Sequence, residues 1–204
     1  MDKIKNIIFD LGGVLLDLDY NKTIAAFRQL GIEHFEKMYS QLTADKLFQH
    51  LETGHITESE FHEAIKKCIP HAVSKEKIDA AWNSLILHFP KEKIDFLERI
   101  SKTYKIFLLS NTNAIHLKHF QQVFIEDTGR GSLESLFSKV WYSHLLGLRK
   151  PGREIYEFVL EDADLVAGET FFIDDTTPNI ETARQLGIRS HLLLPGQRLD
   201  ELGL

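Results

Sequence analysis

From residue 91 onward, short apolar segments alternate with longer amphipathic ones. The apolar segments are rich in β-branched and aromatic residues, a composition typical of strands that are buried on both faces. Strands are predicted at 106–109, 139–142, 170–173 and 188–194, and helices at 91–102, 113–124, 154–160 and 178–186. Strands that alternate with helices predict a parallel sheet covered by helices on both sides. We therefore expect an α/β protein with a doubly wound parallel sheet.

A further strand is predicted near the start of the chain, and a helical block separates it from the others. Residues 4–10 form an apolar run that ends in Asp10, and residues 20–89 show helical spacing. We predict an α/β core at 1–19 and 90–204 and a small helical cap at 20–89, inserted after the first strand. An insertion at this point lies above the carboxyl edge of the sheet, where doubly wound folds bind ligands.

Composition narrows the range of partners. The 204 residues fit one core domain that carries an insertion. The net charge of −6 argues against a nucleic-acid partner, because phosphate backbones require a basic face. No run approaches the roughly 20 apolar residues of a membrane span. The single cysteine, Cys68, excludes an intrachain disulfide, favours a reducing cytoplasm and is predicted to be buried. We expect a cytoplasmic monomer or weak dimer that binds neither nucleic acid nor membrane.

Polar residues follow the predicted strands and would meet at one edge of a parallel sheet; they are Asp10, Ser110 and Asn111, Lys150, and Asp174 and Asp175. Carboxylates about 4 Å apart repel one another by roughly 4 kcal/mol at an effective dielectric constant of 20. A hard divalent cation such as Mg²⁺ would relieve this repulsion. In the alternative interpretation, Asp175 or Thr176 only caps the helix that follows.

The same residues favour phosphate chemistry. A carboxylate such as Asp10, beside a metal in a covered cleft, can attack a phosphoryl group and form an aspartyl-phosphate, although an Asp here can also simply begin a turn. Lys150 offers a positive charge for a phosphate, with Arg149 as the flanking alternative. Ser110 offers a hydroxyl, and the backbone amides after it can bind anionic oxygens at a helix N-terminus.

Four segments of the chain resemble, in order, the motifs of the haloacid dehalogenase superfamily of phosphohydrolases; they are Phe9-Asp10-Leu11-Gly12-Gly13-Val14-Leu15, Leu108-Leu109-Ser110-Asn111-Thr112, Leu148-Arg149-Lys150-Pro151 and Phe172-Ile173-Asp174-Asp175. The resemblance covers nearly the whole chain and implies a Rossmann-like core with a cap between the first two motifs. It also implies a phosphatase that hydrolyses a small phosphomonoester through an aspartyl-phosphate.

The resemblance assigns roles to individual residues. Asp10 would be the nucleophile and a Mg²⁺ ligand, and the carbonyl of Gly12 would be a second ligand. Asp175 would be the third protein ligand, with Asp174 bound directly or through water. The phosphate would be held by Ser110, Asn111 and Lys150.

One position departs from the family pattern. Most phosphatases of the family carry a second Asp two residues after the nucleophile, as the general acid and base, and this chain has Gly12. Possible replacement acids, which the sequence does not rank, are Asp17, Asp19, His50 and His55. We expect the backbone at Gly12 and Gly13 to lie close to the ligand and to leave little room for a side chain. The glycine also looks like that of bacterial phosphatases acting on α-D-glucose 1-phosphate, and the chain is similar to the phosphatase domain of epoxide hydrolases. A sugar phosphate is therefore the expected substrate.

Two other interpretations stay open at this point. A metal-independent haloacid dehalogenase also lacks the second Asp, but leaves the pair Asp174 and Asp175 unexplained. A catalytically impaired relative would bind a phosphorylated metabolite or a protein partner without turnover. His116 and His119 lie one helical turn apart, and we expect them on a solvated helix face rather than at a zinc site.

Overall fold

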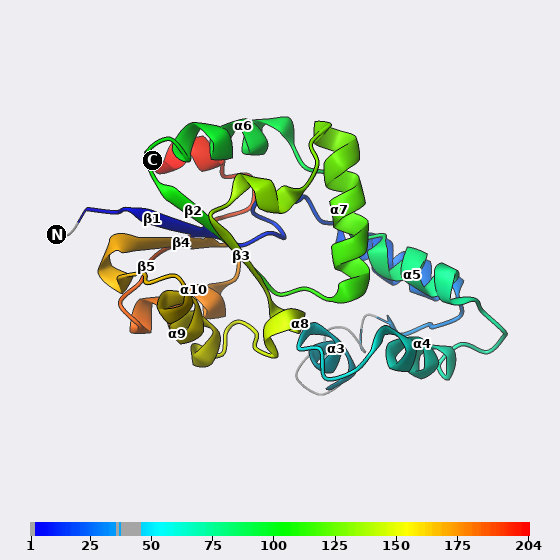
Figure 1. Ribbon diagram of the computed structural model, residues 1–204. Coiled ribbons are helices and arrows are strands. Elements are labelled where there is room, and N and C mark those ends of the chain that lie inside the picture. The colour runs from blue at the N-terminus through cyan, green and yellow to red at the C-terminus, as the bar shows by residue number, and fades with distance from the viewer. Residues whose placement is uncertain (1–2, 36, 38–45) are drawn as a thin grey trace.

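The computed structural model describes residues 3–35, 37 and 46–204, and within them a five-stranded sheet. The strands are β1 (Asn6–Phe9), β2 (Lys105–Ser110), β3 (Lys139–Tyr142), β4 (Thr170–Asp174) and β5 (Arg189–Leu192). Their order is β3-β2-β1-β4-β5, and every neighbouring pair is parallel (Figure 1). The prediction of a doubly wound parallel sheet is therefore confirmed.

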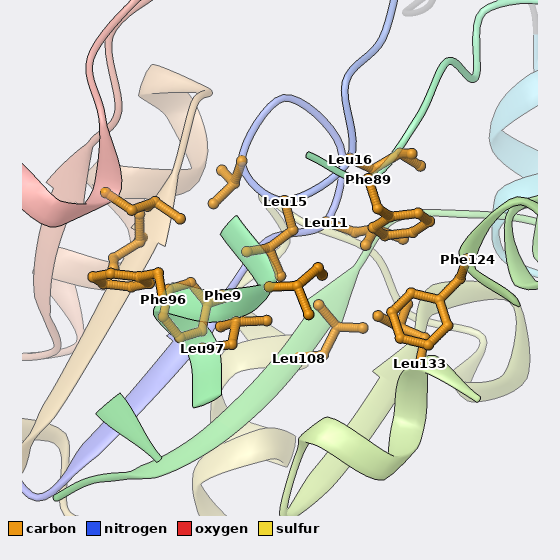
Figure 2. Packing of buried hydrophobic residues seen from close by; sticks show 14 of the residues in the cluster. Phe9, Leu11, Leu15, Leu16, Phe89, Phe96, Leu97, Leu108, Phe124 and Leu133 are labelled. Carbon is orange, nitrogen blue, oxygen red and sulfur yellow. The ribbon is translucent and has the colours of Figure 1, made fainter. Parts of the chain in front are cut away.

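Helices cover both faces of the sheet (Figure 1). The larger ones are α6 (Lys91–Ile100) and α7 (Ala114–Thr128) on one face and α9 (Arg153–Asp162) and α10 (Thr177–Gln185) on the other. Ile7 and Phe9 of β1 share a buried cluster with Phe96 and Leu97 of α6, and Figure 2 shows part of it. Ile8 belongs to the cluster on the opposite face. Because both faces are covered, each inner strand has an unbroken apolar run, at residues 7–9, 106–109 and 171–173.

Short helical turns complete this part of the chain. They are η1 (Leu133–Leu136), α8 (Ser143–Leu146), η2 (Ala167–Glu169) and η3 (Leu199–Leu202). The turn α8 follows β3 directly, at the carboxyl edge of the sheet. No helix in the described ranges has the length and apolar character to cross a bilayer.

The segment inserted between β1 and α6 is helical, as expected, and has its own buried cluster. Its described helices are α1 (Tyr20–Gln29), α3 (Lys46–Glu52), α4 (Glu58–Lys66) and α5 (Lys75–Asn83). Aromatic rings dominate the cluster, and the rings of Phe27 and Phe35 stack with centroids 4.0 Å apart. Ile115 of α7 joins the cluster from the sheet side, so the segment packs on the end of the α7 layer. The boundaries 19/20 and 89/90 stay a prediction.

Two short stretches connect the inserted segment to the sheet, and they are hydrogen-bonded to each other. The backbone amide of Asp17 donates to the carbonyl oxygen of His88 at 3.0 Å, and the amide of Leu87 donates to the carbonyl oxygen of Asp17 at 3.0 Å. The amide of Asp19 donates to the carbonyl oxygen of Leu85 at 2.8 Å. Leu85 and Ile86 continue the helical spacing of the apolar residues of α5 (Lys75–Asn83), but they lie outside the helix. The helix ends at Asn83 because the following residues pair with the chain leaving β1.

Cys68 is exposed, contrary to the prediction that it is buried. Helix α4 ends at Lys66, and the chain then turns so that Ile69 fills the inner face. The Cys68 thiol points outward and lies 3.6 Å from the carbonyl oxygen of Ala64.

Candidate active site at the carboxyl edge

A buried lysine joins two strand ends at the carboxyl edge of the sheet. The Nζ of Lys150 lies 2.7 Å from Oδ1 of Asp10, just after β1, and 2.7 Å from Oδ2 of Asp174, the last residue of β4. Lys150 is 1% exposed. Burial alone would lower the pKa of Lys150, but the two carboxylates raise the pKa above its ordinary value. The lysine is therefore a fixed positive charge between two strands.

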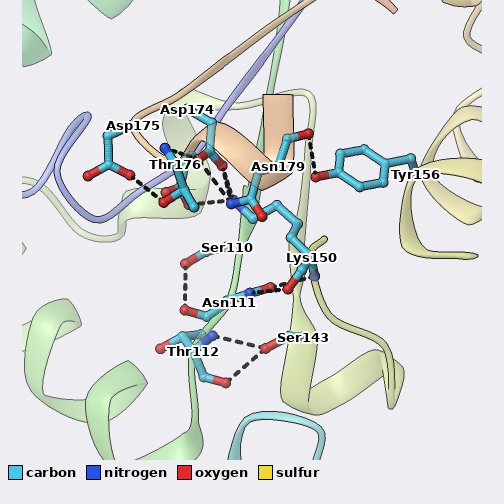
Figure 3. A network of polar contacts seen from close by, with 11 residues as sticks. Ser110, Asn111, Thr112, Ser143, Lys150, Tyr156, Asp174, Asp175, Thr176 and Asn179 are labelled. Atoms are coloured by element: carbon cyan, nitrogen blue, oxygen red, sulfur yellow. Dashed lines mark hydrogen bonds and ion pairs between the residues drawn. The ribbon is translucent and has the colours of Figure 1, made fainter. Parts of the chain in front are cut away.

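Asp174 is fully buried, and hydrogen bonds occupy both of its oxygens (Figure 3). Besides Lys150, it accepts from the backbone amide of Thr176 at 2.8 Å and from Nδ2 of Asn179, which lies 3.0 Å from each oxygen. These four contacts match the roughly four acceptor sites of a carboxylate. Thr176, the N-cap residue of α10, makes no side-chain capping bond. Asp174 is therefore arranged to hold Lys150 and the start of α10.

The site concentrates negative charge. One oxygen each of Asp10, Asp174 and Asp175 lie within 4.8 Å of one another. Burial raises the pKa of Asp10 to about 7, and the charges of Asp174 and Asp175 add to this effect while Lys150 opposes it. Burial and Asp174 also raise the pKa of Asp175. Three carboxylates against one ammonium leave an excess negative charge, and this hard oxygen donor set fits a divalent cation such as Mg²⁺.

Gly13 makes room for Asp175. The φ angle of Gly13 is +73°, and a Cβ there would lie 2.1 Å from Oδ2 of Asp175. A glycine is therefore required at this position. Gly12 differs, because a Cβ there would meet the flexible end of Leu18, with Cδ1 at 2.7 Å. The expected crowding thus holds at Gly13, whereas at Gly12 one movable side chain limits the space.

Ser110 and Asn111 lie at the end of β2, next to Lys150. The side-chain amide of Asn111 donates to the carbonyl of Lys150 at 2.8 Å, and its oxygen accepts from the amide of Lys150 at 2.9 Å (Figure 3). Asn111 thereby fixes the backbone of the lysine. Ser110 is buried and faces the same cavity. The structure brings the predicted residues together, and their roles stay proposals.

A cavity of about 470 Å³ opens at this edge. One end is formed by the polar residues described above, and the other lies under the inserted segment. Its apolar wall includes Leu18, Trp82, Leu85, Ile86 and Phe120. Glu52, the last residue of α3, also lines the cavity, and its Oε2 lies 3.0 Å from both Nε and Nη2 of Arg149. Sequence reasoning missed Glu52, because nothing local marks its contact with a residue 97 positions away.

The four residues named as replacement acids lie elsewhere. None of them is among the described residues that line the cavity. Asp17 pairs with Lys93 at 2.7 Å, and Asp19 caps α1. His55 bonds to the hydroxyl of Thr53 at 2.6 Å, and His50 packs beside His55. These side chains have structural partners of their own.

His116 corrects the prediction of a solvated helix face. Its ring stacks on Trp82 with centroids 4.7 Å apart, its Nδ1 lies 2.8 Å from Oδ1 of Asn83, and it lines the cavity. Burial lowers the pKa of His116 to about 3, so the ring is neutral. His119 is half-buried and does not reach the cavity.

The carboxyl edge of this parallel sheet carries three carboxylates and a buried lysine, and the helices inserted after the first strand lie above it. These features define a class of α/β protein with an acidic, cation-binding pocket. Within that class, a sequence model described as haloacid dehalogenase-like hydrolase matches residues 7–193. The chain belongs to this family.

Similar proteins include enzymes of known name. The chain is 30% identical over 187 residues to the D-ribitol-5-phosphate phosphatase of Bacteroides thetaiotaomicron, covering 92% of this chain and 90% of that one. A crystal structure of a HAD family enzyme from the same organism, in complex with magnesium and inorganic phosphate, is 38% identical, with a TM-score of 0.90 and 98% of each chain covered. A predicted HAD-like hydrolase from Porphyromonas gingivalis is 32% identical, with a TM-score of 0.90 and 99% and 97% covered.

Proposed function

We propose that this protein is a Mg²⁺-dependent phosphatase that hydrolyses a small phosphomonoester through an aspartyl-phosphate. The observation that carries the proposal is the cluster in which Lys150 bridges Asp10 and Asp174 beside Asp175. A relative named as a phosphatase, and a similar structure that holds magnesium and inorganic phosphate, support it.

Each residue has a role in this proposal. A carboxylate oxygen of Asp10 attacks the phosphorus atom, the ester P–O bond breaks, and the alcohol leaves with its bonding electrons and gains a proton. Water then cleaves the aspartyl-phosphate and releases inorganic phosphate. Asp10, Asp175 and the carbonyl of Gly12 would hold Mg²⁺, which neutralises phosphate charge when it is bound. Asp174, whose acceptor sites are filled, positions Lys150 rather than binding the metal directly.

The phosphate would be bound by Lys150, by the hydroxyl of Ser110 and by the backbone amides after it. Asn111 would act by fixing the loop of Lys150. Residues 20–89 would serve as a cap that excludes water from the cavity. The ribitol phosphate in the name of one relative supports a sugar or polyol phosphate as substrate.

The test is turnover of p-nitrophenyl phosphate with Mg²⁺ and with excess chelator. We expect hydrolysis that requires the metal. Binding of phosphate without turnover would point to an impaired relative. Release of halide from a 2-haloacid in chelator would point to a dehalogenase. Each of these two outcomes would contradict the proposal.

A further inference from the structure

The far end of the cavity, under the inserted segment, holds one charged pair among apolar side chains and the polar side chains of Tyr20 and His116. Glu52 comes from α3, and Arg149 precedes Lys150 in the loop between α8 and α9. Their side chains are 20% and 30% exposed, respectively, and both line the cavity with Asp10. The pair therefore faces the space that the leaving group of a phosphomonoester would occupy.

The hydrogen bonds of the pair are incomplete. Arg149 donates through Nε and Nη2 to one oxygen of Glu52, Oε2. No described residue bonds to the second oxygen, Oε1. Burial raises the pKa of Glu52, and the charge of Arg149 acts in the opposite direction. A carboxylate oxygen with spare acceptor capacity, beside a guanidinium, is suited to accept a hydrogen bond from a ligand.

Charge and shape limit what that ligand can be. The pair carries no net charge, so it offers an acceptor and a donor to neutral groups and does not favour a second anion. A leaving group without polar atoms would bury Oε1 unsatisfied, which is costly for a charged group. Apolar residues of the same cavity, such as Trp82 and Ile86, suit the carbon backbone of a polyol.

We infer that Glu52, oriented by Arg149, accepts hydrogen bonds from the hydroxyl groups of the leaving alcohol. This contact makes the enzyme selective for phosphates of polyols or sugars over those of alcohols without further hydroxyl groups. This inference rests on the proposed function and names the residue that sets its substrate class. Glu52 acts on recognition, and the chemistry at Asp10 is common to all substrates.

The test compares a pentitol 5-phosphate with n-pentyl phosphate, which has the same chain length and is also a primary alkyl phosphate. We expect the unmodified enzyme to prefer the pentitol phosphate by about 10²-fold or more in kcat/KM, since sites built around a hydroxyl strongly reject analogues that lack it. Glu52→Gln should reduce kcat/KM for the pentitol phosphate by about 10- to 100-fold and change that for pentyl phosphate by less than about threefold.

Glu58→Gln is the matched control. Glu58 of α4 forms another ion pair between the inserted segment and the sheet side, with Lys118 of α7 at 2.6 Å, and it does not line this cavity. The control should leave the ratio of the two substrates unchanged. The melting temperature of each variant checks folding. If Glu52→Gln does not fold, inhibition of the unmodified enzyme by free pentitol against pentanol tests the same contact, and equal inhibition would overturn the inference.

Four further results would overturn the inference. An equal loss on both substrates in Glu52→Gln would mean that the pair only holds the inserted segment in place. A loss that grows with the pKa of the leaving alcohol, across alkyl and aryl phosphates without hydroxyls, would make Glu52 a general acid instead. Equal turnover of both substrates by the unmodified enzyme would reject the selectivity but keep the proposed phosphatase. An enzyme that hydrolyses neither these substrates nor p-nitrophenyl phosphate would reject both proposals.

Discussion

The two ends of the cavity are built differently. At the sheet end, Lys150 is 1% exposed and held between Asp10 and Asp174, and Asp174 is fully buried with its acceptor sites filled. At the far end, Glu52 and Arg149 are partly exposed and line the cavity together with mainly apolar side chains. Charges that are fixed before substrate binds stabilise a transition state without reorganisation, whereas a partly exposed pair can accept new partners. We therefore propose that the sheet end serves the chemistry and the far end serves recognition.

The largest expected effect tests this division at the sheet end. Asp10→Asn should reduce kcat by about 10⁴-fold or more, because an amide is a poor nucleophile. The loss should be the same for polyol and alkyl phosphates, measured as initial rates. Asp17→Asn is the control, since Asp17 pairs with Lys93 away from the cavity, and its rates should stay within about threefold. A loss confined to one substrate class would contradict the comparison.

The next effect concerns the metal. Mg²⁺ at about 100 times its dissociation constant should stabilise the unmodified protein by about 2.7 kcal/mol, and Asp175→Asn should remove most of this gain. The measurement is the melting temperature with and without Mg²⁺. Glu169→Gln is a matched control at the opposite edge, where Glu169 pairs with Lys5 at 2.7 Å. A full Mg²⁺ response in Asp175→Asn would place the metal elsewhere.

Substitutions of the two glycines after Asp10 should have smaller effects, and they allow Gly13 and Gly12 to be compared in stability and in Mg²⁺ affinity. Gly13→Ala should cost about 1–2 kcal/mol of stability, because its φ of +73° disfavours a Cβ. It should also weaken Mg²⁺ binding by about 10- to 100-fold, because the Cβ displaces Asp175. Gly12→Ala should lose less in both measurements, because only the end of Leu18 must move. Equal losses in melting temperature and Mg²⁺ affinity would show that the two positions are equivalent.

The last prediction is a pH dependence of stability. In chelator, the pKa of Asp10 is raised from 3.8 to about 7, so the folded state binds more protons than the unfolded state between these values. Stability should therefore fall as pH rises through this window, by up to about 4 kcal/mol for a shift of about three pKa units. Thermal unfolding at several pH values measures it, and Asp10→Asn should flatten the slope. Mg²⁺ should oppose the loss, because it binds the ionised carboxylate. An unchanged slope in Asp10→Asn would assign the titration to another group.

The same contrast explains what the sequence could predict. Asp10, Ser110 and Asp174 each lie at or just after the end of an apolar strand, so a parallel sheet brings them together without further information. Helix ends can be predicted in the same way from local residues. Thr57 and Glu60, three residues apart, form the capping box at the start of α4. The resemblance to a family then supplied the roles.

The far end could not be predicted in this way. Glu52 meets Arg149 only because α3 packs against α8, a contact between segments far apart in the chain. The candidate replacement acids lie close to Asp10 in sequence or within the predicted cap, but the fold pairs them with other residues, as it pairs Asp17 with Lys93. The prediction of a solvated face is wrong for His116, because helical spacing does not reveal that Trp82 stacks on its ring.

The most direct test of the central claim is a crystal structure with Mg²⁺ and trifluoroberyllate, which mimics a phosphoryl group on a carboxylate. The account predicts beryllium bonded to a carboxylate oxygen of Asp10, Mg²⁺ held by Asp10 and Asp175, and Lys150 in contact with fluorine. An analogue bound to any other residue, or a magnesium ion away from Asp175, would contradict it.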